Sequence, residues 1–162
     1  MFRLLLVDND ITHANLTARG IQDLRFGVTM KYALSGAQGL LYLAGTRAAK
    51  QSLPEMIIMC ADLPDADGMD VFRTLSEAVS HEAIPILVVS KSTDRKFAAP
   101  YYKAGATAYV PYSEDVESYM RAVSDSVAFV AMMSGLVPRQ NKFFPAEHQG
   151  ELKLGDILQV HL

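Results

Sequence analysis

Short apolar runs alternate with longer stretches of helical periodicity along most of this chain, and this alternation limits the fold more than any other feature. The apolar runs predict strands at Arg3–Val7, Val28–Ala33, Met56–Cys60, Ile84–Val89 and Ala108–Val110. The stretches between and after them predict helices at Thr12–Leu24, Ala37–Ala44, Asp70–Ala78, Asp94–Ala104 and Asp115–Met132. Such alternation is typical of βα units around a parallel sheet. We therefore expect an α/β protein in which a doubly wound, five-stranded parallel sheet lies between two layers of helices.

Two of the predicted helices carry signals of their own. In the last helix, apolar residues recur at helical spacing from Val116 to Val130, and Ser113 is placed to cap its start. In the fourth, Pro100 falls inside the helical stretch, where a proline costs about 3 kcal/mol in a regular helix interior. We expect this helix to be short, kinked or restarted near Pro100.

The chain has 162 residues, which is enough for one well-buried domain and too few for two of ordinary size. We expect that domain to span residues 1–134 and a C-terminal extension to span residues 135–162. In the extension, apolar residues alternate on both sides of Gly155-Asp156, a pattern typical of a short β-hairpin. The extension would cover an apolar patch of its own domain or, alternatively, bind a partner as an arm.

Charge and composition argue against several classes of protein. The net charge of −3 leaves no extended basic surface, so sequence-independent binding of nucleic acid is not expected. The lone cysteine excludes an internal disulfide and suits a reducing compartment. No apolar stretch approaches the roughly 20 residues of a membrane span, and the first apolar run is too short for a signal peptide. We therefore expect a cytoplasmic protein without a membrane segment.

The segment from Pro54 to Gly68, PEMIIMCADLPDADG, resembles the third strand and the following loop of bacterial response-regulator receiver domains. A second segment, GATAYVPYS from Gly105 to Ser113, is similar to the family's motif around the fifth strand. The resemblance covers about residues 2–130. It implies a flavodoxin-like (CheY-like) fold, in which ligands bind beyond the carboxyl ends of the strands.

The resemblance also places the groups of a receiver's phosphorylation pocket on this chain, and several of them are altered. The acidic pair after the first strand becomes Asp8-Asn9. The phosphate-accepting aspartate becomes Cys60, whose thiol cannot form an acyl phosphate. Ser90 preserves the hydroxyl after the fourth strand, whereas Tyr112 replaces the lysine after the fifth. The implied degenerate phosphorylation pocket consists of Asp8, Asn9, Asp10, Cys60, Asp62, Ser90 and Tyr112.

The resemblance implies two further roles. Tyr109 matches the family's switch aromatic, whose inward or outward rotamer reports phosphorylation. A Mg²⁺ ion, if the pocket takes one, would be held by Asp8, Asp10 and Asp62. The alternative is that these acids are solvated loop residues and that no cofactor binds. The histidines show no metal-ligand spacing, so no zinc site is expected; they are His13, His81, His148 and His161.

We interpret the chain as a pseudo-receiver of a two-component phosphorelay, which transmits a signal by protein–protein contact without accepting phosphate. One alternative is a phosphorylatable response regulator that uses Asp62 as a displaced nucleophile. Another is a redox sensor that uses Cys60, although this cysteine is also explained simply as a small buried hydrophobe. An enzyme is not expected, because no set of nucleophile, base and orienting group is visible.

The expected partners are signalling proteins, such as a histidine kinase or a downstream effector. The regions from Gly45 to Pro54 and from Ala128 to Pro138 resemble stand-alone receivers that pair with bacterial phytochrome kinases. The last helix offers more apolar surface than one side of a small sheet needs, which favours a homodimer. The residues that suggest this surplus are Met120, Phe129, Met132 and Met133.

Overall fold

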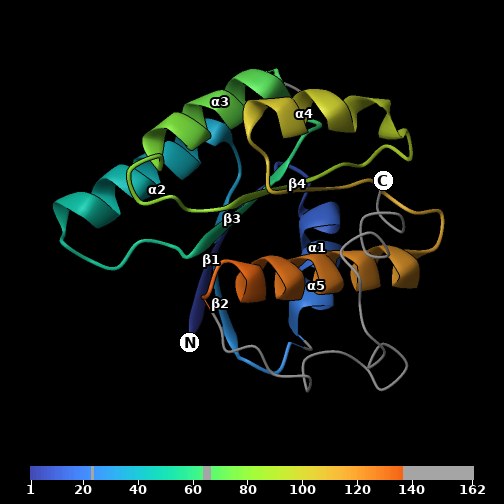
Figure 1. Cartoon of the computed structure of the whole chain (residues 1–162), viewed down its shortest axis with the longest axis horizontal. Helices are drawn as coiled ribbons and strands as arrows, with labels where there is room; N and C mark the ends of the chain where they lie inside the picture. Colours follow the sequence, from blue (N-terminus) through green and yellow to red (C-terminus); the bar gives the residue numbers. More distant parts are fainter. Residues whose placement is uncertain (23, 64–66, 137–162) are drawn as a thin grey trace.

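The computed structural model describes residues 1–22, 24–63 and 67–136, and five parallel strands form its single described sheet (Figure 1). The strands are β1 Phe2–Val7, β2 Val28–Ala33, β3 Met56–Cys60, β4 Ile86–Val89 and β5 Ala108–Val110. The helices are α1 Ile11–Gln22, α2 Gly36–Ala48, α3 Gly68–Ala78, the 3₁₀ helix η1 Arg95–Phe97, α4 Ala98–Ala104 and α5 Val116–Met133. The predicted alternation of strands and helices is therefore confirmed.

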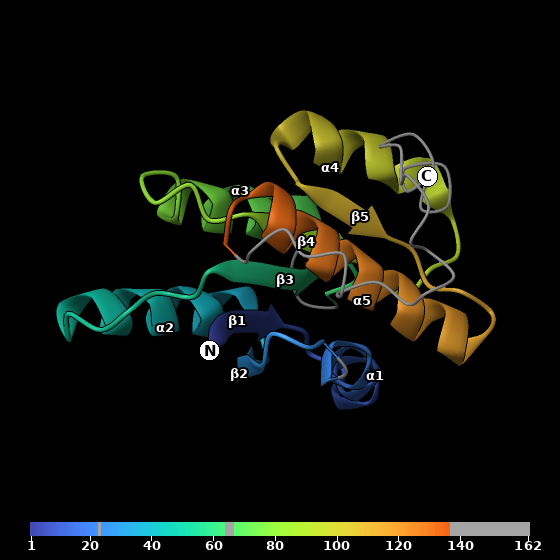
Figure 2. The same cartoon turned by 60° about the horizontal axis from the view of Figure 1, so that its bottom comes forward.

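Helices cover both faces of the sheet and produce three layers, as expected. Figure 1 shows α2, α3 and α4 along one side of the strands and α1 and α5 along the other, and the turned view in Figure 2 brings α5 forward. Each face has its own hydrophobic core: one joins the sheet to α1 and α5, and the other joins it to α2, α3 and α4. Every residue of the central strand β3 is buried, whereas the edge strand β2 is mostly partly or fully exposed. A strand buried on both faces must be continuously apolar, which is why the MIIM run of β3 shows no alternation.

The strand order is β2-β1-β3-β4-β5, so the winding of the chain changes direction between β1 and β3. Parallel pairing brings the carboxyl ends of β1, β3 and β4 to one edge of the sheet. In open α/β sheets, ligand-binding crevices lie at this edge, where the strand order reverses. The topology therefore places the loops after Val7, Cys60 and Val89 around one point.

The fourth helical stretch is interrupted, as Pro100 predicts. The turn of 3₁₀ helix at η1 comes first, and α4 begins at Ala98, so that Pro100 stands in the first turn of α4. A proline is tolerated there because the first amides of a helix have no intrahelical acceptor. Strand β4 is also shorter than predicted and begins at Ile86, because Pro85 has no N–H to offer the strand ladder.

The predicted cap of the last helix is wrong. The side chain of Asp115, not that of Ser113, accepts hydrogen bonds from the amides of Glu117 and Ser118. The Ser118 hydroxyl, with these amides, lowers the pKa of Asp115. The Ser113 hydroxyl lies one step earlier and accepts from the Asp115 amide at 3.4 Å. Both residues are common helix caps, and the carboxylate accepts two amides at once.

The expected hairpin in the C-terminal extension falls on residues 137–162, outside the described residues, and so stays a prediction. Within the described ranges, none of the helices has both the length and the apolar character that a membrane crossing requires.

Helices α1 and α5 approach each other closely at Gly20, and a substitution there tests this packing. A Cβ on Gly20 would lie 2.6 Å from the carbonyl oxygen of Met120, which belongs to the α5 backbone and cannot easily yield. We expect Gly20→Ala to lower the free energy of unfolding by about 1–3 kcal/mol.

The matched control is Gly45 in α2, around which no atom lies within 4 Å of an added Cβ. Gly45→Ala should raise the free energy of unfolding by about 0.5–1 kcal/mol, because alanine is the better helix former. Chemical denaturation of both variants measures the two effects. Equal stabilisation by both would contradict the close helix contact at Gly20.

Candidate functional site

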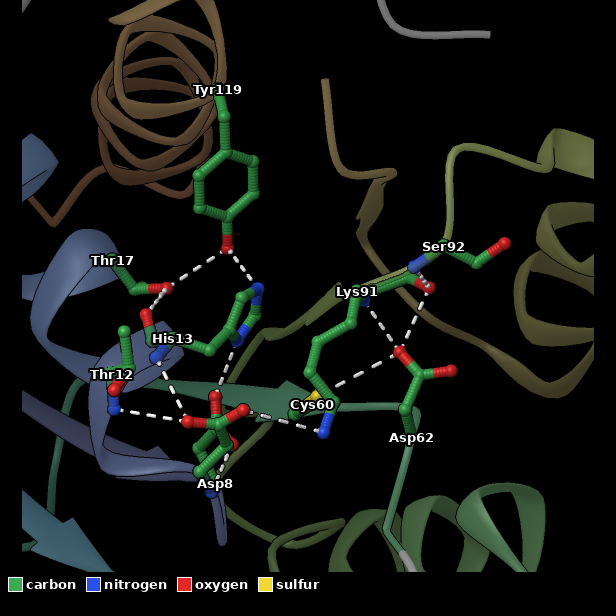
Figure 3. Close-up of polar contacts among 11 residues, drawn as sticks. Asp8, Thr12, His13, Thr17, Cys60, Asp62, Lys91, Ser92 and Tyr119 are labelled. Atoms are coloured by element: carbon green, nitrogen blue, oxygen red, sulfur yellow. Dashed lines mark hydrogen bonds and ion pairs between the residues drawn. The ribbon is translucent and has the colours of Figure 1, made fainter. Parts of the chain in front are cut away.

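The candidate site lies where the carboxyl ends of three neighbouring strands meet. Asp8 follows β1, Cys60 is the last residue of β3, and Ser90 follows β4. All three are buried, with exposed fractions of 0%, 0% and 1%. The sequence interpretation expected these residues to share a pocket, and Figure 3 shows Asp8 and Cys60 on neighbouring strands with their side chains close together.

Asp8 is bound by a histidine that the sequence interpretation had set aside. The Nδ1 atom of His13, in the first turn of α1, lies 2.6 Å from Asp8 Oδ2. The other ring nitrogen, Nε2, lies 2.9 Å from the hydroxyl of Tyr119 on α5. That hydroxyl lies 2.9 Å from Thr17 Oγ1, which donates to the carbonyl of His13 at 3.2 Å. Figure 3 shows this buried chain of four contacts, which runs from the end of β1 to α5.

The number of available protons determines how this chain is satisfied. Thr17 and Tyr119 supply one hydroxyl proton each, and the carbonyl of His13 can only accept. All four contacts are hydrogen bonds at once only if Nε2 donates to Tyr119 and a further proton lies between Nδ1 and Asp8 Oδ2. A neutral imidazole has one proton fewer, and one contact then lacks a donor. The full network therefore requires one proton more than a neutral imidazole beside an ionised Asp8 can supply.

Cys60 lies within this buried polar environment as a thiol. Burial, followed by the nearby charge of Asp8, raises its pKa to about 12. Its Sγ atom donates to Asp62 Oδ2 at 3.9 Å. A thiol of high pKa without solvent exposure is a weak nucleophile. This environment argues against the alternative of a Cys60 redox sensor.

Asp62 is partly buried and binds to the loop after β4. Its Oδ2 atom accepts a hydrogen bond from the Ser90 hydroxyl at 3.0 Å and another from the backbone amide of Lys91. Ser90 Oγ in turn accepts from the amide of Ser92 at 3.0 Å. One carboxylate oxygen therefore holds the loop after β4 to the loop after β3, as Figure 3 shows.

Asp10 caps α1. Its Oδ1 atom accepts from the amides of Thr12 and His13 at 3.0 and 3.3 Å, and its Oδ2 atom lies 3.6 Å from Lys91 Nζ. The hydrogen bond from the His13 amide lowers the pKa of Asp10 more than any other contact. Asn9, between the two acids, has a buried Oδ1 atom with no hydrogen-bond partner among the described residues.

The two tyrosines of the predicted site lie on different sides of the sheet. Tyr109 is 1% exposed and packs against Tyr101, with ring centroids 5.6 Å apart; burial raises the pKa of its hydroxyl. Tyr112 lies against Tyr119 and His13 at centroid distances of 5.0 and 6.2 Å. Tyr112 therefore extends an aromatic cluster between α1 and α5, and it brings no cation to the pocket.

The predicted cation ligands Asp8, Asp10 and Asp62 each have different partners, so this set stays a prediction. In the part of the chain that the structure describes, the group with ligand atoms close enough for one metal ion is Asp8, His13 and Cys60, all within 4.8 Å of one another. Sequence reasoning missed His13 and Lys91. The signal for His13 is its place in the first helical turn after a strand that ends in an acid, since this turn faces the carboxyl edge of the sheet.

The buried thiol leads to a test of Cys60 chemistry. Because its pKa is raised to about 12, the thiolate fraction near neutral pH is about a thousandfold below that of a free cysteine. We expect a chromogenic disulfide reagent to label Cys60 at least that much more slowly in the folded protein than in denaturant. Labelling of the folded protein at the rate of a free thiol would restore the redox alternative.

Comparisons with known proteins agree with this architecture. The family model described as the response regulator receiver domain matches residues 4–124. A relative from Methanothrix harundinacea, the probable methanogenesis regulatory protein FilR2, is 27% identical over 124 residues, which are 76% of this chain and 80% of that protein.

Solved structures of response regulators share the fold. The Mn²⁺-bound form of Rcp1 has a TM-score of 0.69 at 16% identity and covers 82% of this chain and 96% of its own. The phosphorylated cyanobacterial phytochrome response regulator RcpA has a TM-score of 0.66 at 16% identity, with coverages of 86% and 99%. RPA3017, a response regulator in red light signalling of R. palustris, has a TM-score of 0.66 at 17% identity; the match covers 82% of this chain and 94% of RPA3017. The expected flavodoxin-like, CheY-like fold is confirmed, and at these identities the structures show the fold alone.

Proposed function

Since the chain belongs to the response regulator receiver family, we propose that it is a pseudo-receiver, a two-component signalling protein that acts through protein contacts without accepting phosphate. It would bind a histidine kinase or a downstream effector in the cytoplasm, and not nucleic acid. The proposal concerns the chemistry of the pocket, because the fold alone does not determine function.

The observation that carries the proposal is the position of the Asp62 carboxylate. In the family, the hydroxyl after the fourth strand holds the phosphoryl group. Here the Ser90 hydroxyl, together with the Lys91 amide, already donates to Asp62. A carboxylate oxygen that accepts these two donors resembles a phosphoryl oxygen in charge and in hydrogen bonding. The chain thus supplies its own anion, and no phosphate is needed to gather these groups.

The remaining pocket residues support the same proposal. The acceptor position holds the buried thiol of Cys60. The carboxyl group of Asp8 already has a partner, since its Oδ2 atom lies 2.6 Å from His13 Nδ1. Tyr112, in the place of the family's lysine, packs on aromatic rings. Phosphoryl transfer depends on charge stabilisation by a cation and by positioned donors, and these three positions no longer supply it.

The position of Tyr109 indicates which signalling state of the receiver a partner protein would bind. In the family, the inward or outward rotamer of this aromatic reports phosphorylation, and here the ring is almost fully buried. Together with the contact between Ser90 and Asp62, this supports a receiver held in one signalling state. We propose that its abundance or its partner, and not its phosphorylation, regulates the signal.

The second candidate, phosphorylation of Asp62, is favoured by one observation. The carboxylate of Asp62 lies beside the Ser90 hydroxyl, where a phosphorylated side chain would need a donor. Against it, Asp62 is not among the residues whose ligand atoms form the metal-compatible group. Phosphoryl transfer to Asp62 would therefore lack the cation that neutralises the phosphate oxygens.

Incubation with acetyl phosphate and Mg²⁺ tests both candidates. We expect intact-mass spectrometry to show no phosphoryl adduct on the wild-type chain, because the nucleophile, one metal ligand and the lysine of the family are replaced. Asp62→Asn is the matched variant, since it keeps the size of the side chain and removes its nucleophile. An adduct on the wild type that is absent from Asp62→Asn would replace the pseudo-receiver with the second candidate.

We also propose that the chain forms a homodimer through α5. Met120, Phe129 and Met132 are partly buried, and Met133 is 52% exposed, so part of the predicted apolar surplus stays uncovered within the described residues. Light scattering over a concentration series should show a dimer without any phosphoryl donor, and Met133→Glu should shift it toward the monomer.

Leu41→Glu is the control for this test, because Leu41 is 72% exposed on α2, on the opposite side of the sheet. A monomer at all concentrations, or equal effects of both substitutions, would contradict a dimer through α5.

A further inference from the structure

We propose that Asp8, His13 and Cys60 form a binding site for a divalent d-block cation of the Zn²⁺ class. This inference goes beyond the proposed function and does not depend on it. Family resemblance would predict a hard cation held by carboxylates, whereas the residues gathered here combine a carboxylate, an imidazole and a thiol.

The geometry brings three different donor atoms to one point. One ligand atom from each of Asp8, His13 and Cys60 lies within 4.8 Å of the others. Of these side chains, His13 Nδ1 and Asp8 Oδ2 are 2.6 Å apart. All three residues are buried, at 0%, 4% and 0% exposure. Donors bound tetrahedrally to one Zn²⁺ ion at about 2.0–2.3 Å lie about 3.3–3.8 Å apart. The contact of 2.6 Å between His13 and Asp8 must therefore open by about 1 Å when the ion enters.

The hydrogen-bond chain behind His13 is the support that a metal-ligating histidine needs. Such a histidine usually donates its second N–H to a fixed acceptor, which sets its tautomer and orientation. In the fully bonded chain, Nε2 donates to Tyr119, which donates to Thr17. The lone pair of Nδ1 then faces Asp8. A cation bound between Nδ1 and Asp8 Oδ2 can replace the proton that otherwise lies between these two atoms.

The nature of the donors selects the class of metal. Mg²⁺ requires oxygen ligands in near-octahedral geometry and keeps several waters. Thiolate and imidazole donors suit Zn²⁺ and its neighbours in the first transition series. The replacements that would weaken a magnesium site, Cys60 and Asn9, therefore leave a donor set suited to a softer ion.

One oxygen atom is a candidate for a fourth position. The buried Asn9 Oδ1 atom, in the residue after Asp8, has no partner among the described residues. Binding replaces two protons, the thiol proton of Cys60 and the proton between His13 and Asp8, so one M²⁺ enters as two H⁺ leave.

Titration with CoCl₂ in a non-coordinating buffer tests the site, because Co²⁺ adopts the geometry of Zn²⁺ and reports it by colour. We expect one Co²⁺ per chain, visible ligand-field bands of tetrahedral intensity and a near-ultraviolet thiolate-to-cobalt charge-transfer band. An equivalent of Zn²⁺ should abolish all of these bands, whereas excess Mg²⁺ should leave them unchanged.

Variants assign the bands to residues. Cys60→Ser should eliminate the charge-transfer band, and His13→Gln should eliminate tight binding. Tyr119→Phe should weaken Co²⁺ affinity about 10- to 100-fold while the band position stays the same, since it removes only the hydroxyl behind His13. The control chain carries His81→Gln, His148→Gln and His161→Gln, keeps the proposed ligands, and should bind as the wild type does.

A measurement without any substitution guards against variants that do not fold. X-ray absorption of the Zn²⁺-loaded wild type should show one sulfur scatterer at about 2.3 Å with nitrogen and oxygen neighbours. The proposal is overturned if the shell around zinc contains no sulfur, if no charge-transfer band forms, or if the histidine control chain loses binding. Phosphorylation of Asp62 would overturn the proposed function and leave the cobalt and zinc measurements unaffected. Failure of the proposed function can therefore be distinguished from failure of the proposed metal site.

Discussion

The contact between Asp8 and His13 is the interaction on which the rest of the pocket depends. A carboxylate without solvent exposure is costly unless it is paired and hydrogen-bonded. Asp8 has both kinds of partner, since His13 faces Oδ2 and the Asp10 amide donates to Oδ1 at 2.9 Å. Because His13 is also held by Tyr119 and Thr17, the acid at the end of β1 fixes the first turn of α1 against α5. A receiver pocket without this histidine would have to leave the acid open to a metal ion or to water.

Most of the fold was predictable, because the signals that specify it are local. Within the described residues, apolar runs and helical spacing identified each strand and α-helix, and Pro100 predicted the break before α4. The errors lie at the ends of elements, where two neighbouring residues compete for one role. Ser113 and Asp115 are both common caps, and only the three-dimensional course of the chain decides which side chain reaches the amides of α5.

The site was predictable in part, for a physical reason that separates its residues into two groups. Asp8, Cys60 and Ser90 stand at strand ends, and parallel pairing alone brings strand ends together. His13 has only the weaker signal of its place in the first turn after β1. Its contact with Tyr119 depends on the packing of α1 on α5, more than a hundred residues apart in the chain, and no spacing in the sequence reports that contact. Asp62 lies beyond its strand, so its hydrogen bonds with Ser90 and Lys91 depend on the path of a loop.

Lys91 connects the two halves of the pocket by two bonds of different character. Its backbone amide donates to Asp62 on one side, and its ammonium lies 3.6 Å from Asp10 on the other. The hydrogen bond from the backbone amide depends little on ionic strength, whereas a partly exposed ion pair is screened as the salt concentration rises. Salt should therefore loosen the loop after β4 from the start of α1 while leaving it tied to the loop after β3. The salt concentration, through its effect on Lys91, would then determine whether these three loops move together as one rigid unit or as two independent parts.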